Sequence, residues 1–273
     1  FSRSEHPSVA AMLVHELMAC VHEAAAHVWP LSSRSRQERW GVILATTKGA
    51  IEDYVWRDDA PETPTDAIQP ILELLQPLLG LEVHESAAVS NACASSHGAV
   101  YLATRWLQQR RADRVLIAAC DYVGPFIGTG FSTLKSMGYV TPFGAQRKGL
   151  QLGDGAAVLL LQRDPKPGAI QIANVAIDSE GHAVTRTAAH GESLAGCFAN
   201  MGRPDVVMAH GTGTNINDQI EDSVFARVVG RDVPVTCTKW SVGHTLGASG
   251  AIDIIAAAEI LRRRQTFAIA NTR

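Results

Sequence analysis

A cysteine separates a β-branched run from a helical pattern in the stretch VSNACASSHGAV, residues 89–100. We expect this thiol, Cys93, to lie at the N-terminus of the helix, where free N–H groups and the helix dipole favour thiolate over thiol. The same N–H groups could stabilise the oxyanion of a tetrahedral intermediate. A lone cysteine is more often a small core residue. The small residues around Cys93 favour a nucleophile, because they clear the backbone for close approach of a ligand.

A histidine ends a hydrophobic strand pattern in AHGTGTNINDQIED, residues 209–222. α/β folds place functional groups where a strand meets the following loop, and two glycines there permit unusual backbone angles. A purely structural turn would explain the glycines but not His210. Polar side chains that could line or orient this turn follow at Thr212, Thr214, Asn217, Asp218 and Glu221.

A lysine and a second histidine lie five residues apart in TKWSVGHTLGASGAIDII, residues 238–255. A phosphate-binding loop is an alternative interpretation of its glycines, but Lys239 precedes them, whereas the lysine of a P-loop follows its glycines. Taken alone, His244 is equally consistent with a core histidine, and Lys239 with a solvated side chain. The chain has neither an HExxH motif nor a CxxC pair, so no metal site is predicted.

The composition is that of a globular protein: 273 residues, 46% hydrophobic and 19% charged, with a formal net charge of −3. Its Lys and Arg residues are scattered, which argues against nucleic-acid and membrane partners. The sequence lacks an apolar run of roughly 18 residues and a secretory signal pattern, so a cytoplasmic location is expected. Five cysteines without a CxxC pair suggest neither a disulfide framework nor a thiolate zinc site.

Short β-branched runs alternate with amphipathic stretches, which predicts an α/β fold with largely parallel strands. The predicted helices cover residues 7–28, 67–79 (broken by Pro70 and Pro77), 94–109 and 251–264. The predicted strands cover residues 41–46, 86–92, 115–120, 156–162, 170–177, 206–210 and 235–238. Each half delivers a reactive residue from a strand into a turn, so we expect two similar halves, 1–163 and 164–273, with a seam at 163–168.

The order of the three motifs, Cys93 followed by HGTGTxxND and then KxxxGH, resembles that of a β-ketoacyl synthase. GVILAT and the stretch over residues 141–161 are also similar to segments of this family, although Asp154 replaces the usual Glu. The resemblance implies a thiolase-like five-layer α/β/α/β/α fold of two pseudo-duplicated halves.

The resemblance also implies roles for individual residues. Cys93 matches the acyl-accepting nucleophile, and His210 and His244 match the histidines that face the thioester carbonyl of the second substrate. Lys239 and Glu221 match paired charges, and Glu221 is the predicted ion-pair partner of Lys239. The residues that match the pantetheine-binding threonines are Thr212 and Thr214.

The implied reaction is the decarboxylative condensation of an acyl thioester with malonyl-ACP, in fatty acid or polyketide biosynthesis. The substrates would be carried on the phosphopantetheine of acyl carrier protein or on coenzyme A, with no other cofactor. A homodimer, or a heterodimer with a related ketosynthase subunit, is expected.

Two family features are not found in the sequence: an additional first strand and a glycine-phenylalanine-glycine-glycine loop that supplies an oxyanion-hole N–H. A fragment or a naturally shortened relative would account for this. Two other functions stay open, a non-condensing subunit resembling a chain-length factor and a thiolase-fold acyltransferase or hydrolase. Retention of Cys93, His210 and His244 favours the condensing enzyme, because chain-length factors usually lack the cysteine.

Overall fold

The computed structural model describes residues 8–27, 38–55, 63–139, 141–164, 167–180 and 190–269. The chain forms two compact units built from interleaved segments. The first unit comprises Phe1–Phe126, Asp154–Gln171 and Thr245–Ala251, and the second unit comprises Ile127–Gly153, Ile172–His244 and Ile252–Arg273. The predicted similarity of the halves 1–163 and 164–273 stays a prediction.

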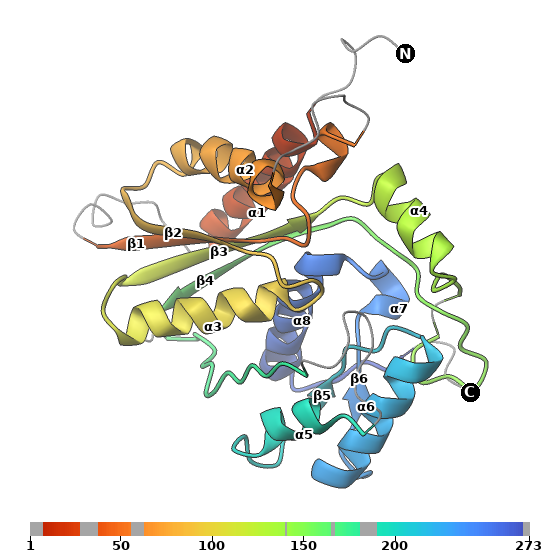
Figure 1. The fold of residues 1–273 in the computed structure, drawn as a ribbon. Coiled ribbons are helices and arrows are strands. Elements are labelled where there is room, and N and C mark those ends of the chain that lie inside the picture. The colour runs from red at the N-terminus through yellow and green to blue at the C-terminus, as the bar shows by residue number, and fades with distance from the viewer. Residues whose placement is uncertain are drawn as a thin grey trace. The chain divides into compact units, whose positions relative to one another are not determined.

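The first unit is built on a four-stranded sheet in the order β2-β1-β3-β4 (Figure 1). The strands are β1 (Trp40–Ala45), β2 (Val83–Val89), β3 (Arg114–Asp121) and β4 (Gly155–Gln162). β1 runs parallel to both β2 and β3, while β4 runs antiparallel to β3. The expected parallel pairing therefore holds for three strands, and β4 is an antiparallel edge.

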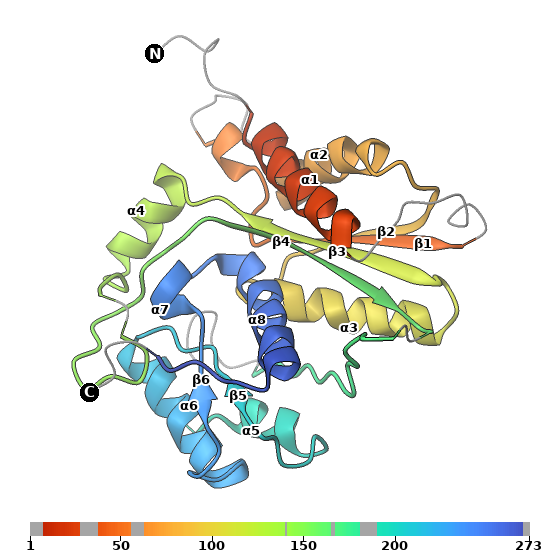
Figure 2. The ribbon, with the colours of Figure 1, turned by 180° about the vertical axis from the view of Figure 1, so that it is seen from behind.

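Helices cover both faces of this sheet (Figures 1 and 2). α1 (Val9–His27) and α2 (Pro64–Leu78) lie on one face, where they pack on alternate strand residues such as Val42 and Leu44. α3 (Ser95–Gln108) lies on the other face, and its Trp106 comes so close to Gly41 that an added Cβ would be 2.9 Å from the ring. Because both faces are covered, every residue of β1 is buried.

The predicted break in the second helix is wrong, since α2 is continuous with Pro70 and Pro77 inside it. A proline lacks the N–H that would bond the carbonyl four residues earlier. For Pro70 this carbonyl belongs to Asp66, and the Tyr54 hydroxyl donates to it at 3.0 Å. A side chain thus replaces the missing backbone hydrogen bond, and Pro77 falls in the last turn.

The second unit is mainly helical around a core that includes Phe225, Val229 and Cys237. Its short strands, β5 (Val207–Met208) and β6 (Val235–Thr236), are parallel and shorter than predicted. Its helices are α5 (Glu192–Phe198), α6 (Asn215–Val228) and α7 (Lys239–Val242). Two further helices have residues in both units, α4 (Pro125–Thr133) and α8 (Ser249–Arg263), and the short 3₁₀ turns are Ile51–Asp53 and Leu246–Ala248.

The predicted strand over residues 170–177 is wrong, because that stretch forms no ladder and its Ile172 and Ile177 are exposed. The strand predicted over 86–92 ends at Val89, where the chain turns toward α3. The predictions for α1, α3, α8, β1, β3 and β4 agree with the structure to within two residues. Pro7, Val28 and residues 165–166 of the predicted seam lie outside the described residues. Within the described ranges, every helix is too short or too polar to cross a bilayer.

Candidate active site

The turn that carries Cys93 is a tight elbow between β2 and α3 in the first unit. Ala92 has a φ of +46°, a strained value for a residue with a Cβ. The Ala94 N–H donates to the Asn91 carbonyl at 3.0 Å, and the Ser95 N–H donates to the Ala92 carbonyl at 3.2 Å. The partly buried Cys93 thus lies two residues before α3, at the predicted helix N-terminus.

Ser95 is fully buried and holds the elbow closed. Its hydroxyl accepts the Asn91 N–H at 2.9 Å and donates to the Ala92 carbonyl at 2.6 Å. The same hydroxyl lies 3.2 Å from the carbonyl oxygen of Thr46, at the end of β1. A side chain immediately after the elbow therefore connects it to the sheet.

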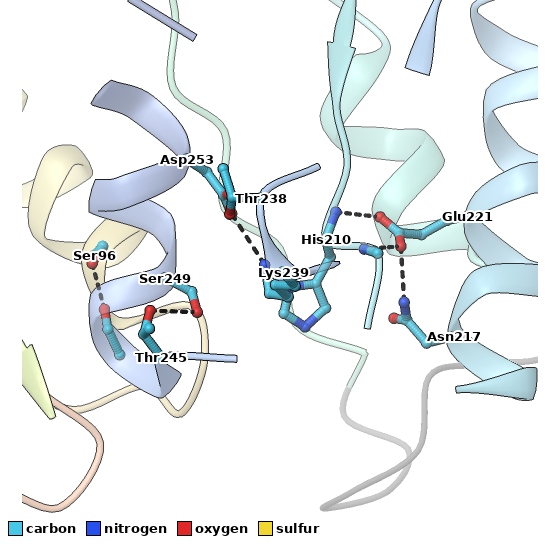
Figure 3. A network of polar contacts seen from close by, with 11 residues as sticks. Ser96, His210, Asn217, Glu221, Thr238, Lys239, Thr245, Ser249 and Asp253 are labelled. Atoms are coloured by element: carbon cyan, nitrogen blue, oxygen red, sulfur yellow. Dashed lines mark hydrogen bonds and ion pairs between the residues drawn. The ribbon is translucent and has the colours of Figure 1, made fainter. Parts of the chain in front are cut away.

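His210 follows β5 and is held through its backbone by α6 (Figure 3). The Glu221 carboxylate accepts the N–H groups of His210 and Gly211, each at 2.7 Å, and the Asn217 amide at 2.8 Å. Burial raises the pKa of Glu221 to about 7 against the lowering effect of these hydrogen bonds. Glu221 orders the His210 turn, and helix α6, which was not predicted, supplies it.

The rest of the HGTGT turn is fixed in a similar way. Asp218 accepts the N–H groups of Gly213 at 3.1 Å and Phe143 at 2.8 Å. The hydroxyls of Thr212 and Thr214 lie 2.9 Å apart and hydrogen-bond to each other. The role predicted for both threonines, binding a pantetheine arm, stays a prediction.

The predicted ion pair between Lys239 and Glu221 is wrong. Lys239 is fully buried and its Nζ lies 3.1 Å from the Asp253 carboxylate, to which Thr238 also donates (Figure 3). Glu221 is occupied by the backbone N–H groups of the His210 turn instead. One feature of the sequence could have indicated a role for Asp253. It is an acidic residue in the first turns of a helix that otherwise begins with small and apolar residues.

The two predicted histidines come together in the second unit. The ring centroids of His210 and His244 are 5.1 Å apart, with an interplanar angle of 86°. Burial, together with the smaller effect of the nearby Lys239 charge, lowers the pKa of His244 to about 3. His244 is therefore a neutral imidazole near neutral pH, which can donate a hydrogen bond from one nitrogen.

The glycines after His244 do not form a phosphate-binding loop. The Gly247 N–H donates to the Asp121 carboxylate at 2.7 Å, so the chain itself supplies the anion. A Cβ added at Gly250 would lie 2.5 Å from a His97 ring nitrogen, so this glycine allows α3 to approach closely. Asp121 was not singled out in the sequence, although an acid that ends an apolar strand is a usable signal.

The predicted site residues divide between the units as follows. Cys93 belongs to the first unit, together with Thr245, the residue that follows His244. The residues in the second unit are Thr212, Thr214, His210, Glu221, Lys239 and His244. Their predicted roles, and the predicted absence of a metal or resident cofactor, stay predictions.

Two family models match successive parts of the chain. The β-ketoacyl synthase N-terminal domain matches residues 84–166, and the β-ketoacyl synthase C-terminal domain matches residues 170–273. The chain belongs to the β-ketoacyl synthase family. The resemblance inferred from the three motifs is thereby confirmed.

Curated relatives of this β-ketoacyl synthase chain include Nodulation protein E of Rhizobium meliloti, 28% identical over 231 residues, covering 77% of this chain and 55% of the relative. The putative polyketide β-ketoacyl synthase 1 of Streptomyces cyaneus is 30% identical over 210 residues, covering 67% of this chain and 50% of the relative. The chain thus spans about half the length of the curated relatives it matches.

Solved structures agree on the fold. A ketosynthase of Xenorhabdus doucetiae, in complex with its chain length factor, is 23% identical with a TM-score of 0.74 over 100% of this chain and 75% of that chain. A type II polyketide ketosynthase complexed with its acyl carrier protein is 20% identical with a TM-score of 0.86 over 98% of this chain and 76% of that chain. The predicted thiolase-like α/β fold is confirmed.

Proposed function

We propose that this chain carries out the condensation step of a β-ketoacyl synthase, in fatty acid or polyketide biosynthesis. The observation that supports this most is the pair of adjacent imidazoles, His210 and His244, of which His244 is held neutral by burial. Neutral imidazoles can donate N–H groups to an oxygen that becomes negative during the reaction, without first losing a proton.

In the proposed reaction, the Cys93 thiolate attacks the carbonyl carbon of an acyl thioester. The carrier thiolate leaves, and the acyl group stays on the Cys93 sulfur. This step needs no external base once the helix N-terminus favours the thiolate. The position of Cys93 two residues before α3 supports this assignment.

The second step starts with a malonyl thioester, whose C–C bond breaks with loss of carbon dioxide. The electron pair forms an enolate, and the N–H groups of His210 and His244 stabilise its oxygen, each donor contributing about 3 kcal/mol in a dry site. The enolate carbon attacks the acyl carbonyl, and the Cys93 thiolate leaves. The product is a 3-oxoacyl thioester on the second carrier.

Lys239 and Asp253 take a supporting role in this proposal. As a buried pair, they order the start of α8 and the segment that leads to His244 rather than abstracting protons. The Lys239 charge also disfavours protonation of His244. Glu221 has the equivalent supporting role for His210 through the backbone.

The substrates and partners in this proposal follow from the family. We assign phosphopantetheine-borne acyl and malonyl groups on acyl carrier protein as substrates, a cytoplasmic location, and a homodimer or a heterodimer with a related subunit. The Xenorhabdus doucetiae ketosynthase is complexed with its chain length factor, and the type II ketosynthase with its acyl carrier protein, which supports both kinds of partner.

The proposal is tested by incubating the protein with acyl and malonyl carrier proteins and measuring intact masses and products. We expect an acyl adduct on the native protein, none on Cys93→Ala, and a 3-oxoacyl product only when both substrates are present. Free acid alone would indicate a hydrolase. Neither adduct nor product, even with a related ketosynthase subunit added, would indicate a non-condensing subunit resembling a chain-length factor.

A further inference from the structure

Asp121, at the end of β3, is a buried carboxylate that the proposed reaction does not use; it is 3% exposed. It accepts hydrogen bonds from the Thr46 hydroxyl at 2.8 Å, from the Thr47 N–H and hydroxyl at 2.9 Å each, and from the Gly247 N–H at 2.7 Å. In the described part of the chain these partners are all uncharged donors. Burial raises the pKa of Asp121, and these hydrogen bonds oppose that rise. Both oxygens of Asp121 therefore serve as hydrogen-bond acceptors.

One branch of this network leads to the cysteine elbow. Thr46 donates its hydroxyl to Asp121, and its carbonyl oxygen lies 3.2 Å from the Ser95 hydroxyl. Ser95 in turn bonds the backbone of Asn91 and Ala92, the two residues before Cys93. Two residues, Thr46 and Ser95, therefore connect Asp121 to the strained turn that presents the thiol.

The other branch leads to the segment Thr245–Ala251, which follows His244. Asp121 holds the N–H of Gly247, while the Ser96 hydroxyl donates to the carbonyl of the same glycine. A Cβ at Gly247 would lie 2.7 Å from Asp121 Oδ2 and 2.9 Å from the Thr47 nitrogen, so only glycine fits there. The N–H and the carbonyl of Gly247 are thus both hydrogen-bonded to side chains of the unit that contains Cys93.

We propose that Asp121 is a positioning residue, which fixes the Cys93 elbow and the segment after His244 to the same point of the first unit. Its effect on thiol reactivity is independent of the condensation step, and its effect on carbon–carbon bond formation rests on the proposed function. An amide at this position would present an NH₂ group to donors that now meet a carboxylate oxygen, so the elbow would lose its alignment with the N-terminus of α3.

The test measures alkylation of Cys93 by iodoacetamide as a function of pH, read by peptide mass. In Asp121→Asn we expect the apparent pKa of Cys93 to rise by about one unit, which lowers the rate at neutral pH about tenfold. Removal of a nearby negative charge would by itself lower this pKa. A rise in the Cys93 pKa would therefore show that the elbow has lost its alignment with the N-terminus of α3. An unchanged or lowered Cys93 pKa overturns the proposal.

A matched pair at Thr46 decides the question if Asp121→Asn does not fold. Thr46→Val keeps the shape but removes the hydroxyl, whereas Thr46→Ser keeps the hydroxyl. We expect Thr46→Val to reproduce the slower alkylation and Thr46→Ser to restore at least half of the native rate. Equal rates in the two variants would overturn the proposal.

Asp53→Asn controls for a general loss of stability. Asp53 accepts the N–H groups of Val9 at 2.8 Å and Ala10 at 3.2 Å, outside the Asp121 network. The Asp53→Asn variant should have a lower urea midpoint but an unchanged rate of Cys93 alkylation. If its alkylation slowed as much as that of Asp121→Asn, the effect would be merely structural. If alkylation responds as expected but native protein forms no 3-oxoacyl product, the proposed function fails while the role of Asp121 stands.

Discussion

The Lys239–Asp253 pair offers the sharpest energetic test of the site. The Nζ atom lies 3.1 Å from the carboxylate, and with an effective dielectric constant of about 20 this corresponds to a Coulomb attraction of about 5 kcal/mol. The desolvation of both charges offsets part of that attraction. Removing one partner alone costs more than the net attraction of the pair, because Asp253→Asn leaves a fully buried ammonium group without a counter-charge. We expect that variant to lose about 3–5 kcal/mol of unfolding free energy.

The assay is urea denaturation of Lys239→Met, Asp253→Asn and the double variant, from which a coupling energy is obtained. We expect the double variant to be more stable than the sum of the single losses predicts, by about 2–3 kcal/mol. A second cycle combines Lys239→Met with Glu221→Gln. Since Glu221 binds backbone N–H groups, its coupling to Lys239 should stay below about 0.5 kcal/mol. A larger coupling to Glu221 than to Asp253 would refute the pairing and restore the one predicted from the motifs.

Three further predictions concern single features. Burial lowers the pKa of His244 from its ordinary value of 6.5 to about 3, so the unfolded state takes up this proton at a higher pH than the folded state. The unfolding free energy should therefore fall by about 5 kcal/mol as the pH drops from 6.5 to 3. Histidine NMR should show this imidazole neutral at pH 5. Tyr54→Phe should lower the unfolding free energy by about 1 kcal/mol in urea, and the loss should shrink in a Pro70→Ala background, where a backbone N–H can satisfy the same carbonyl. Gly41→Ala should lower the thermal midpoint, because its Cβ would meet the Trp106 ring at 2.9 Å, with a penalty of about 1–3 kcal/mol; an unchanged midpoint would mean that the ring moves aside freely.

The first unit was predictable largely because its signals are local. The periodicity of α1 and α3 and the apolar runs of β1 and β3 identify buried elements, and small residues on both sides of Cys93 mark the elbow. α6 was missed because its first turns, NINDQIED, are polar and follow a glycine turn, although tertiary contacts bury Asp218 and Glu221. The run over residues 170–177 has the alternation of a strand, but in the described residues no neighbour pairs with it.

The site was predictable at the level of residue types and not of partners. Motif order selected Cys93, His210 and His244, but it could not choose between two acids as the counter-charge of Lys239. Glu221 and Asp253 lie 18 and 14 residues away along the chain, on different helices. Distance in sequence carries no information on such a pairing, because it depends on how α6 and α8 pack in the second unit.

Asp121 gives the glycine turn after His244 an internal counterpart of a bound anion. With the substitution Asp121→Gly, the protein would keep the same donors around a space the size of a small carboxylate. Formate has the charge and geometry of the missing group, so added formate should restore stability in that variant and leave the native protein unaffected. The turn would then be an anion-binding site that the Asp121 side chain fills in the native protein.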